Sequence, residues 1–210
     1  MQHVRIPQDR LGVLIGEGGE TMREIEREAE VRLDIDSETG SVGVESVGDP
    51  ITALKGPDIV RAIGRGFSPD AALTLLEDDM TMFDLIDIDA ATRNDKDMRR
   101  KKGRLIGEDG RTRELMEELS GASVVIYGST LGAIGGPQEV EAVRGATEML
   151  LEGAPHGAAY SFLERKHNEM KSQGMEYHRF PGSRSQPEPE PESEIEVESE
   201  SRSRSRSGSG

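Results

Sequence analysis

The spacing of hydrophobic residues changes along the chain between a period of two, typical of strands, and the spacing of a helix face. These two periods predict the secondary-structure elements. Apolar–polar alternation predicts strands over residues 2–6, 31–36 and 41–47, the last with Val42 or Val44 and Val47 as its apolar members. Helical spacing predicts helices over residues 8–15 and 22–29 and from Pro50 to Ile63, with Ile51, Leu54, Ile59 and Ile63 on one face. The Gly56-Pro57 pair should interrupt the last helix, because proline removes a backbone donor and clashes with the preceding turn.

The same order of elements recurs in the second half of the chain. It predicts strands over residues 85–88, 124–127 and 131–135 and helices over residues 96–106, from 111 to 120 and from 137 to 150, followed by a helical extension. Residues 14–21 and 105–112, 91 positions apart, share the pattern Leu-Ile-Gly-Glu-x-Gly-x-Thr. Self-similarity at a fixed period indicates a duplicated unit. We therefore expect one fold twice, over residues 1–80 and 81–178.

The spacing between the two copies changes along the chain. Pro50 matches Pro137 and Gly66 matches Gly153, and these pairs lie 87 positions apart rather than 91. We expect the four-residue difference to fall in the turn between the last two strands, because turns tolerate insertions best.

Composition narrows the class of protein. The chain has 210 residues, no cysteine and a net charge of −15, which excludes disulfides and thiolate metal sites. No stretch approaches the roughly 18 apolar residues of a membrane span, and the N-terminus lacks the features of a signal peptide, so a cytoplasmic protein without membrane contact is expected. An acidic composition with little lysine is typical of proteins from organisms adapted to high salt. At molar salt the screening length falls to about 3 Å, so global acidity need not repel nucleic acid.

Residues 179–210 differ from the rest of the chain. Proline–glutamate repeats give way to glutamate–serine and then arginine–serine alternation, with almost no apolar residues. Such a segment cannot offset its ordering entropy by burial, so a disordered tail is predicted. A solubilising role is favoured over contact between the arginine–serine run and RNA.

Several chemistries find no support in the residues. Neither copy of the repeated octet ends in the Gly-Lys-Ser/Thr of a phosphate-binding loop, and the preceding segment is helical rather than the strand that a dinucleotide fingerprint requires. The four histidines, His3, His156, His167 and His178, are far apart and expected to be solvated, and no metal-binding or catalytic grouping is present. We expect no enzyme activity and no cofactor.

A helix–G-x-x-G–helix turn favours binding to single-stranded RNA. Glycines let the backbone approach a phosphate chain, and the following helix adds the positive end of its dipole. K-homology (KH) domains clamp about four nucleotides with this loop. Each unit resembles a KH domain of the eukaryotic type (type I). The resemblance implies an α+β fold of two such domains, each a three-stranded sheet packed by helices. RNA modules that stack bases on exposed aromatics do not fit a chain with 3% aromatic residues.

The charge around the two loops differs. The variable loop positions are Glu17-Gly18 and Glu108-Asp109, and carboxylates are unfavourable beside phosphate. Residues 93–113 carry nine basic and four acidic residues, whereas acids outweigh bases around the first loop. The second copy is thus the expected RNA contact, and the first loop is expected to serve packing. The candidate RNA-binding residues are Gly107, Glu108, Asp109, Gly110, Arg111, Arg104, Lys101, Lys102 and Arg113, with Gly16, Glu17, Gly18 and Gly19 in the first copy.

Two further segments carry a closer resemblance. Ala-Ile-Gly-Arg-Gly-Phe-Ser-Pro at residues 62–69 and the basic run at residues 98–107 resemble an archaeal family of two-KH ribosomal RNA-processing proteins, over about residues 3–175. The acidic surface, the Gly56-Pro57 pair and the tail depart from it. The resemblance implies a scaffold that binds near the 3′ end of 16S rRNA during small-subunit maturation. It also implies two protein partners, a PIN-domain endonuclease and the alpha subunit of archaeal initiation factor two.

Three alternatives stay open at this point. They are a general KH protein linked to mRNA or transcription, a scaffold that binds only proteins, and an intrinsic ribonuclease.

Overall fold

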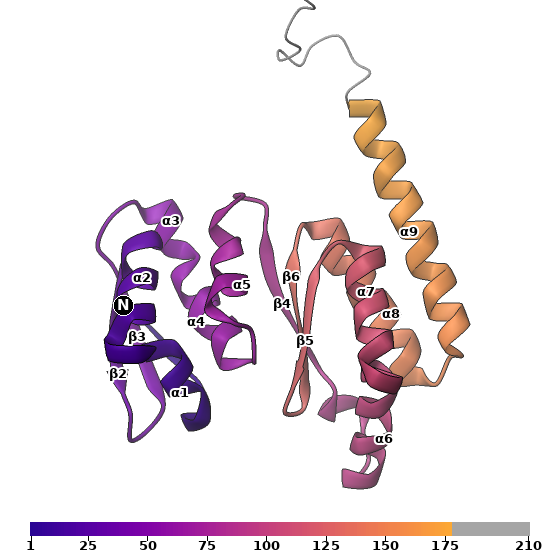
Figure 1. The fold of residues 1–210 in the computed structure, drawn as a ribbon, viewed down its shortest axis with the longest axis horizontal. Coiled ribbons are helices and arrows are strands. Elements are labelled where there is room, and N and C mark those ends of the chain that lie inside the picture. Colours follow the sequence, from indigo (N-terminus) through magenta and orange to yellow (C-terminus); the bar gives the residue numbers. More distant parts are fainter. Residues whose placement is uncertain (178–210) are drawn as a thin grey trace, which may run out of the picture.

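Two three-stranded antiparallel sheets frame the protein in the computed structural model, which describes residues 1–177. The first has the order β1 (Gln2–Arg5), β3 (Ser41–Ser46), β2 (Val31–Asp36), and the second has the order β4 (Met82–Asp87), β6 (Thr130–Gly135), β5 (Ser123–Tyr127). The expected α+β fold with two equivalent three-stranded sheets is confirmed (Figure 1). The predicted tail lies outside the described residues.

Helices complete each unit. The first unit holds α1 (Gln8–Ile15), η1 (Glu17–Gly19), α2 (Glu20–Glu28), α3 (Pro50–Leu54), α4 (Gly56–Gly64), α5 (Pro69–Leu73) and η2 (Thr74–Leu76). The second unit holds η3 (Asp89–Ala91), α6 (Asp95–Ile106), η4 (Glu108–Gly110), α7 (Arg111–Ser120), α8 (Pro137–Glu152) and α9 (His156–Tyr177). None of these helices is both long and apolar enough to cross a membrane.

Local sequence explains where several helices begin. Pro50 and Pro69 stand at the first position of their helices, where a missing amide costs nothing. The side chains of Asp49 and Ser68 accept hydrogen bonds from backbone amides of the first turn. The predicted break is confirmed, because α3 ends before the Gly56-Pro57 pair and α4 begins with it.

Three details of the predicted pattern are wrong. Ile51 and Leu54 are 65% and 67% exposed, because the break separates α3 from α4 and leaves α3 outside the core. Val47 lies beyond the end of β3 and is exposed, while Val42 and Val44, two residues apart on one strand face, are both buried. Strand β4 begins at residue 82 rather than 85, because its first residues pair with the far end of β6.

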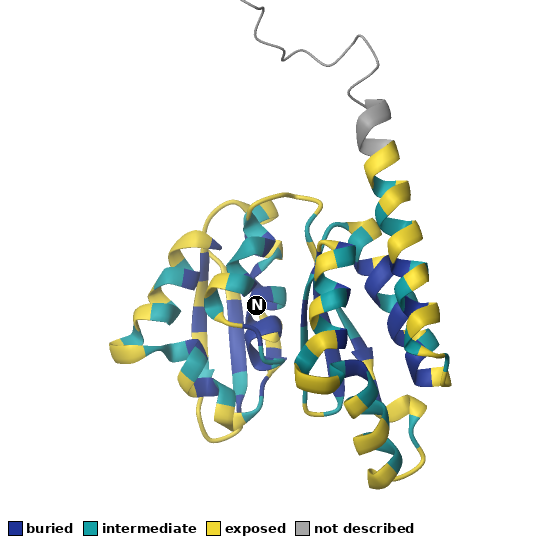
Figure 2. Ribbon diagram, turned by 45° about the vertical axis from the view of Figure 1, so that its right-hand side comes forward, coloured by how far each residue is buried: buried dark blue, intermediate teal, exposed yellow. Residues whose placement is uncertain are grey.

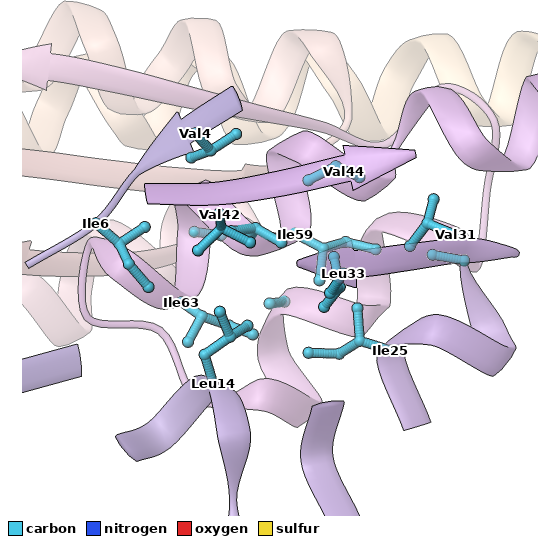
Figure 3. Packing of buried hydrophobic residues seen from close by; sticks show 14 of the residues in the cluster. Val4, Ile6, Leu14, Ile25, Val31, Leu33, Val42, Val44, Ile59 and Ile63 are labelled. Carbon is cyan, nitrogen blue, oxygen red and sulfur yellow. The ribbon is translucent and has the colours of Figure 1, made fainter. Parts of the chain in front are cut away.

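Each unit packs one face of its sheet against its own helices. In the first unit, Leu14 and Ile25 from the helices around the loop meet Ile59 and Ile63 from α4 over Val42 of the sheet (Figure 3). The second core is built from Leu105, Met116, Leu131 and Leu150, among others. The leucines that open the two octets, Leu14 and Leu105, are fully buried, so the octets anchor the cores as well as forming the turns.

The two units are joined through the outer face of the second sheet. Helices α4 and α5 lie between the two sheets (Figure 1). Buried residues line the strands and the inner helix faces of each unit (Figure 2). Ile134 of the second sheet, with the half-buried Phe83 and Val125, packs against the core of the first unit. Phe67 packs edge-to-face on Phe83, with ring centroids 6.1 Å apart. A side chain at Gly66 would place its Cβ 2.9 Å from the Cβ of Tyr127, so glycine is needed there. The segment at residues 62–69 therefore forms the joint between the units.

A polar contact reinforces this joint. The Tyr127 hydroxyl donates a hydrogen bond to the Asp9 carboxylate at the start of α1, which raises the pKa of the tyrosine above its usual range. The Arg10 guanidinium lies 5.8 Å from the centre of the same ring.

The change in spacing between the copies is not confined to one turn, as was expected. Four residues join β2 to β3 but two join β5 to β6, and three residues join β3 to α3 but only Gly136 joins β6 to α8. The four-residue difference is thus divided equally between the hairpin and the next connection. Both connections lie outside the paired strands, so either can change length without altering the sheet register.

Candidate nucleic-acid interface

The first glycine of both G-x-x-G loops adopts the same unusual backbone conformation. Gly16 has φ 74° and ψ 178°, and Gly107 has φ 79° and ψ 177°. This region of backbone space is almost restricted to glycine. A Cβ at either position would lie 2.2 Å from the hydroxyl oxygen of the octet's own threonine, Thr21 or Thr112. The Gly…Thr pair of the octet is therefore a packing requirement for the tight turn.

The last glycine of each loop has more space. Gly19 and Gly110 have φ 80° and 83°, and each immediately precedes a helix. A Cβ at Gly19 would meet only the tip of Arg23, at 3.8 Å, and one at Gly110 would meet only Glu114 Oε1, at 4.0 Å. These glycines thus set the backbone direction and leave the helix N-termini uncrowded, as a loop that receives a phosphate chain requires.

The middle of the loop distinguishes the two copies. Gly18 has φ 56°, and the equivalent Asp109 has φ 49°, so an aspartate holds a left-handed conformation there. Aspartate tolerates this conformation better than most residues, although the left-handed region costs an L-residue about 1 kcal/mol. Glu108 and Asp109 are exposed, as are Glu17 and Gly18. Any phosphate at the second loop would therefore meet two carboxylates.

Helix α6 brings cations to the second loop. Arg100 and Arg104 line the opening beside Gly107 and Asp109. Lys102 Nζ donates to the carbonyl of Gly128 at 3.1 Å, which places its charge at the β5–β6 turn. Lys101 Nζ donates to the carbonyl of Ala91. Both bonds are to neutral acceptors, and among the described residues neither ammonium group forms a salt bridge, although Lys101 contributes to the lowered pKa of Asp97.

Arg104, a candidate RNA-binding residue, has a structural role. Its guanidinium donates to the carbonyls of Leu150 and Ala154 at the end of α8 and is half-buried. In the first unit, Arg10 donates in the same way to the carbonyls of Ile63 and Phe67, the equivalent acceptors. The two arginines hold corresponding helix ends, although they occupy different turns of their own helices.

The two arginines that follow the second loop differ in freedom. Arg111 is 62% exposed and lies 3.8 Å from Glu114, a loose pair that leaves its charge accessible. Arg113 is paired with Glu117, whose other carboxylate oxygen accepts a hydrogen bond from the backbone amide of Val124 at 2.9 Å. Arg111 is therefore the better placed of the two for a ligand at the loop.

The carboxylates that tie the second helix of each unit to its sheet were missed in the sequence. Glu117 accepts from Val124, and Glu26 accepts from the amide of Leu33 at 2.8 Å. The donors and acceptors are each 91 positions apart, so the repeat itself carried the signal. The two glutamates therefore have the same structural role in the two units.

The first loop is closed by its own arginine. Arg23 donates through Nε to the carbonyl of Gly19 at 3.0 Å and through a second nitrogen to the carbonyl of Gly18. The equivalent position in the second unit is Glu114. Since Arg10 also points inward, the first loop has fewer free cations beside it than the second.

Helix α9 braces the second loop from behind. Tyr160 Oη and the Thr112 hydroxyl are 3.0 Å apart, and His156 Nε2 lies 2.9 Å from the carbonyl oxygen of Arg104. His167 Nδ1 lies 3.0 Å from the carbonyl oxygen of Leu119. The expectation that these two histidines are solvated is wrong, because α9 packs on α7 and α8 and both rings have backbone carbonyl partners. Within residues 1–177 no cluster of histidine and acidic side chains could hold a metal ion.

These features define the class of the protein: two type I KH folds in one chain, each with a G-x-x-G loop between two helices. Residues 1–60 match the KH domain family, and residues 82–168 match the eukaryotic-type KH domain (KH domain type I).

Relatives place the chain more narrowly. The KH domain-containing protein MJ0443 of Methanocaldococcus jannaschii is 43% identical over 176 residues, covering 82% of this chain and 77% of the relative. The pre-rRNA-processing protein pno1 of Emericella nidulans is 33% identical over 148 residues, covering 69% and 57%. This chain spans about half the length of that fungal relative.

Solved structures agree with the sequence comparison. The crystal structure of Dim2p from Pyrococcus horikoshii is 44% identical, covers 78% of this chain and 98% of that one, and superposes with a TM-score of 0.73. The Dim2p chain in the a/eIF2alpha–aDim2p–rRNA complex from the same organism is 43% identical, covers 80% and 94%, and gives 0.75. The chain belongs to the family of tandem KH-domain proteins that includes archaeal Dim2p and PNO1, and the closer resemblance seen in the sequence is confirmed.

Proposed function

We propose that this protein is a single-stranded RNA-binding scaffold in small-ribosomal-subunit biogenesis, bound near the 3′ end of 16S rRNA. The observation that carries this proposal is the second G-x-x-G loop, whose backbone geometry is that of a phosphate-approaching turn beside the basic helix α6. Kinship with pre-rRNA-processing proteins, and with a protein crystallised in complex with rRNA and a/eIF2alpha, supports the assignment.

The second unit is proposed as the principal RNA contact. Backbone amides around Gly110 and the N-terminus of α7 would face the phosphate chain, and Arg111 and Lys102 would flank it. Arg104, Thr112 and Tyr160 act as positioning residues, since they hold α6, the loop and α9 together. The protein then presents an RNA end to other factors and performs no chemistry itself.

Two protein partners complete the proposal. A PIN-domain endonuclease would cut the RNA that the scaffold presents, and the alpha subunit of archaeal initiation factor two would bind the same assembly. The acidic composition supports action in a cytoplasm of high salt, where only local charge governs the encounter.

Crosslinking in cells followed by sequencing of the bound RNA tests the assignment. Enrichment at the 3′ end of 16S rRNA is expected, whereas enrichment on messenger RNA would overturn it in favour of a general KH protein. An Arg111→Glu and Lys102→Glu double variant should lose RNA affinity in purified form. Unchanged affinity would favour a scaffold that binds only proteins, and cleavage of precursor RNA by the protein alone would favour a ribonuclease.

A further inference from the structure

A basic cleft lies between α6, the segment that precedes it and the end of α8, and we refer to it as the α6–α8 cleft. It encloses about 780 Å³. Five cations line it, namely Arg93, Lys96, Arg100, Lys101 and Arg104. Two carboxylates, Asp97 and Glu152, also line it, which leaves an excess of three positive charges in a protein of net charge −15. A local excess of this sign favours an anionic ligand.

The charges in this cleft are only partly compensated. Arg100 donates to Asp97 at 2.7 Å and lowers the pKa of that carboxyl below its usual range, so this one pair is ionised and mutually neutral. Arg104 donates to carbonyls at the end of α8, which offsets the negative end of that helix dipole. Within residues 1–177 neither Arg93 nor Lys96 forms a salt bridge, and both are exposed.

The cleft is built by an insertion that only the second unit has. Arg5 and Asp87 each pair with the first residue of the third strand and lie 82 positions apart, whereas the two octets lie 91 apart. The second unit therefore carries nine more residues between its first strand and its loop. They form η3, the connection to α6 and an added turn of α6, and Arg93 and Lys96 belong to them. The KH fold of the first unit forms without this segment. In the second unit Met98 of the added turn packs against the core, whereas Arg93 and Lys96 are exposed, so core packing does not account for these two cations.

The cleft continues to the second G-x-x-G loop. Arg100 and Arg104 line both the cleft and the opening beside Gly107 and Asp109. Along α6, the eleven residue steps from Lys96 to Gly107 span about 16 Å. An RNA chain that leaves the loop along this helix would pass from the two acidic loop side chains to the cations that line the cleft.

We propose that the α6–α8 cleft holds the sugar-phosphate backbone of the RNA segment that adjoins the one bound at the second loop. This inference rests on the proposed RNA-binding function and extends its footprint beyond the about four nucleotides that a KH loop clamps. Arginine and lysine contacts to phosphate add affinity without reading sequence. The cations of the cleft also supply positive charge that the loop lacks, because the variable positions of the loop are the acidic Glu108 and Asp109.

The test compares two RNA lengths with two matched double variants of the full chain. Arg93→Gln/Lys96→Gln removes two exposed cations from the cleft, and Arg165→Gln/Lys171→Gln removes two exposed cations from α9. Fluorescence anisotropy is measured over a range of salt with an RNA of about four nucleotides centred on the crosslinked site and one of about twelve that contains it. Near 0.15 M salt the cleft variant should bind the longer RNA about tenfold more weakly, with a salt slope smaller by about 1.4.

The short RNA should bind the wild type and both double variants equally, and the α9 variant should keep the wild-type affinity for the longer one. Equal affinity of the cleft variant and the wild type for the longer RNA would overturn the proposal, as would an equal loss for both lengths. A poly-glutamate peptide that binds the wild type but not the cleft variant, with RNA affinity unchanged, would overturn it in favour of an acidic protein partner. Failure of the wild type to bind either RNA would instead refute the proposed function.

Discussion

Aspartate at the last glycine of each loop forms a matched pair of perturbations. Gly19 and Gly110 share the left-handed conformation, with φ 80° and 83°, and both have room for a Cβ. The backbone strain should be similar in the two variants, about 1 kcal/mol. For a protein of this size that lowers the Tm by about 2 to 4 °C. The new carboxylate would lie beside Arg23 in Gly19→Asp and beside Glu114 in Gly110→Asp, so the second variant should be less stable by up to about 1 kcal/mol, and affinities are compared where both variants are folded.

RNA affinity should separate them. A new carboxylate about 5 Å from a bound phosphate costs about 0.8 kcal/mol at the dielectric constant of water and about 3 kcal/mol at an effective value near 20. Gly110→Asp should thus weaken RNA binding by about fourfold to 200-fold. Gly19→Asp should change it by less than about twofold if the second loop makes the principal contact.

The assay is fluorescence anisotropy with RNA from the crosslinked site, with thermal unfolding of each variant as the control. Equal losses of affinity in the two variants would refute the assignment of RNA to the second loop. Aspartate at Gly16 or Gly107 cannot serve this purpose, because the Cβ alone would clash with threonine at 2.2 Å and unfolding would dominate.

Three further predictions concern stability. Gly107→Ala should destabilise the protein by about 3 kcal/mol or more, against about 1 kcal/mol for Gly110→Ala, because only the former clashes with Thr112. Glu117→Gln should cost about 1 to 2 kcal/mol, since it weakens the bond that ties α7 to β5. The hydrogen bond to Asp9 raises the pKa of Tyr127 and stabilises the folded state only while the phenol is protonated. As the pH rises above about 10, the free energy of unfolding should therefore fall more steeply for the wild type than for Tyr127→Phe.

Urea or thermal denaturation measures each of these. Equal stability of the two alanine variants would contradict the steric argument for Gly107. For Glu117→Gln, the matched variant Glu26→Gln should show a similar loss, and a loss in only one unit would show that the two ties are not equivalent. Parallel pH profiles for the wild type and Tyr127→Phe would mean that the interdomain hydrogen bond contributes nothing.

Local sequence patterns predicted much of the fold. The octets predicted both loops because Gly16 and Gly107 require a backbone conformation that glycine alone adopts readily. Alternation of apolar and polar residues placed β2, where one face is buried. The pattern misplaced Ile51 and Leu54, because periodicity records which residues are apolar but not whether a short helix after a break reaches the core.

The candidate site was only partly readable. Charge counting found the basic helix α6, but it could not assign each cation a partner. Arg104 counts as one positive charge in the sequence, whereas in the structure it donates hydrogen bonds to one carbonyl in the last turn of α8 and one just beyond it. Lys96 counts equally and lies free at the rim of a cleft. Partners distant in sequence decide between these roles, and no local pattern records them.

The sequence by itself determined the duplicated loop, because each octet carries the glycines and the threonine that its turn requires within eight consecutive residues. Tertiary structure alone decided how the units meet, because Gly66 lies against Tyr127 and Phe67 against Gly132, residues of the second sheet that are more than 60 positions away in sequence. It also decided that the insertion before α6 opens a basic cleft beside one loop. Conformational demands are local and leave a sequence signature, whereas surfaces formed by distant segments exist only after folding.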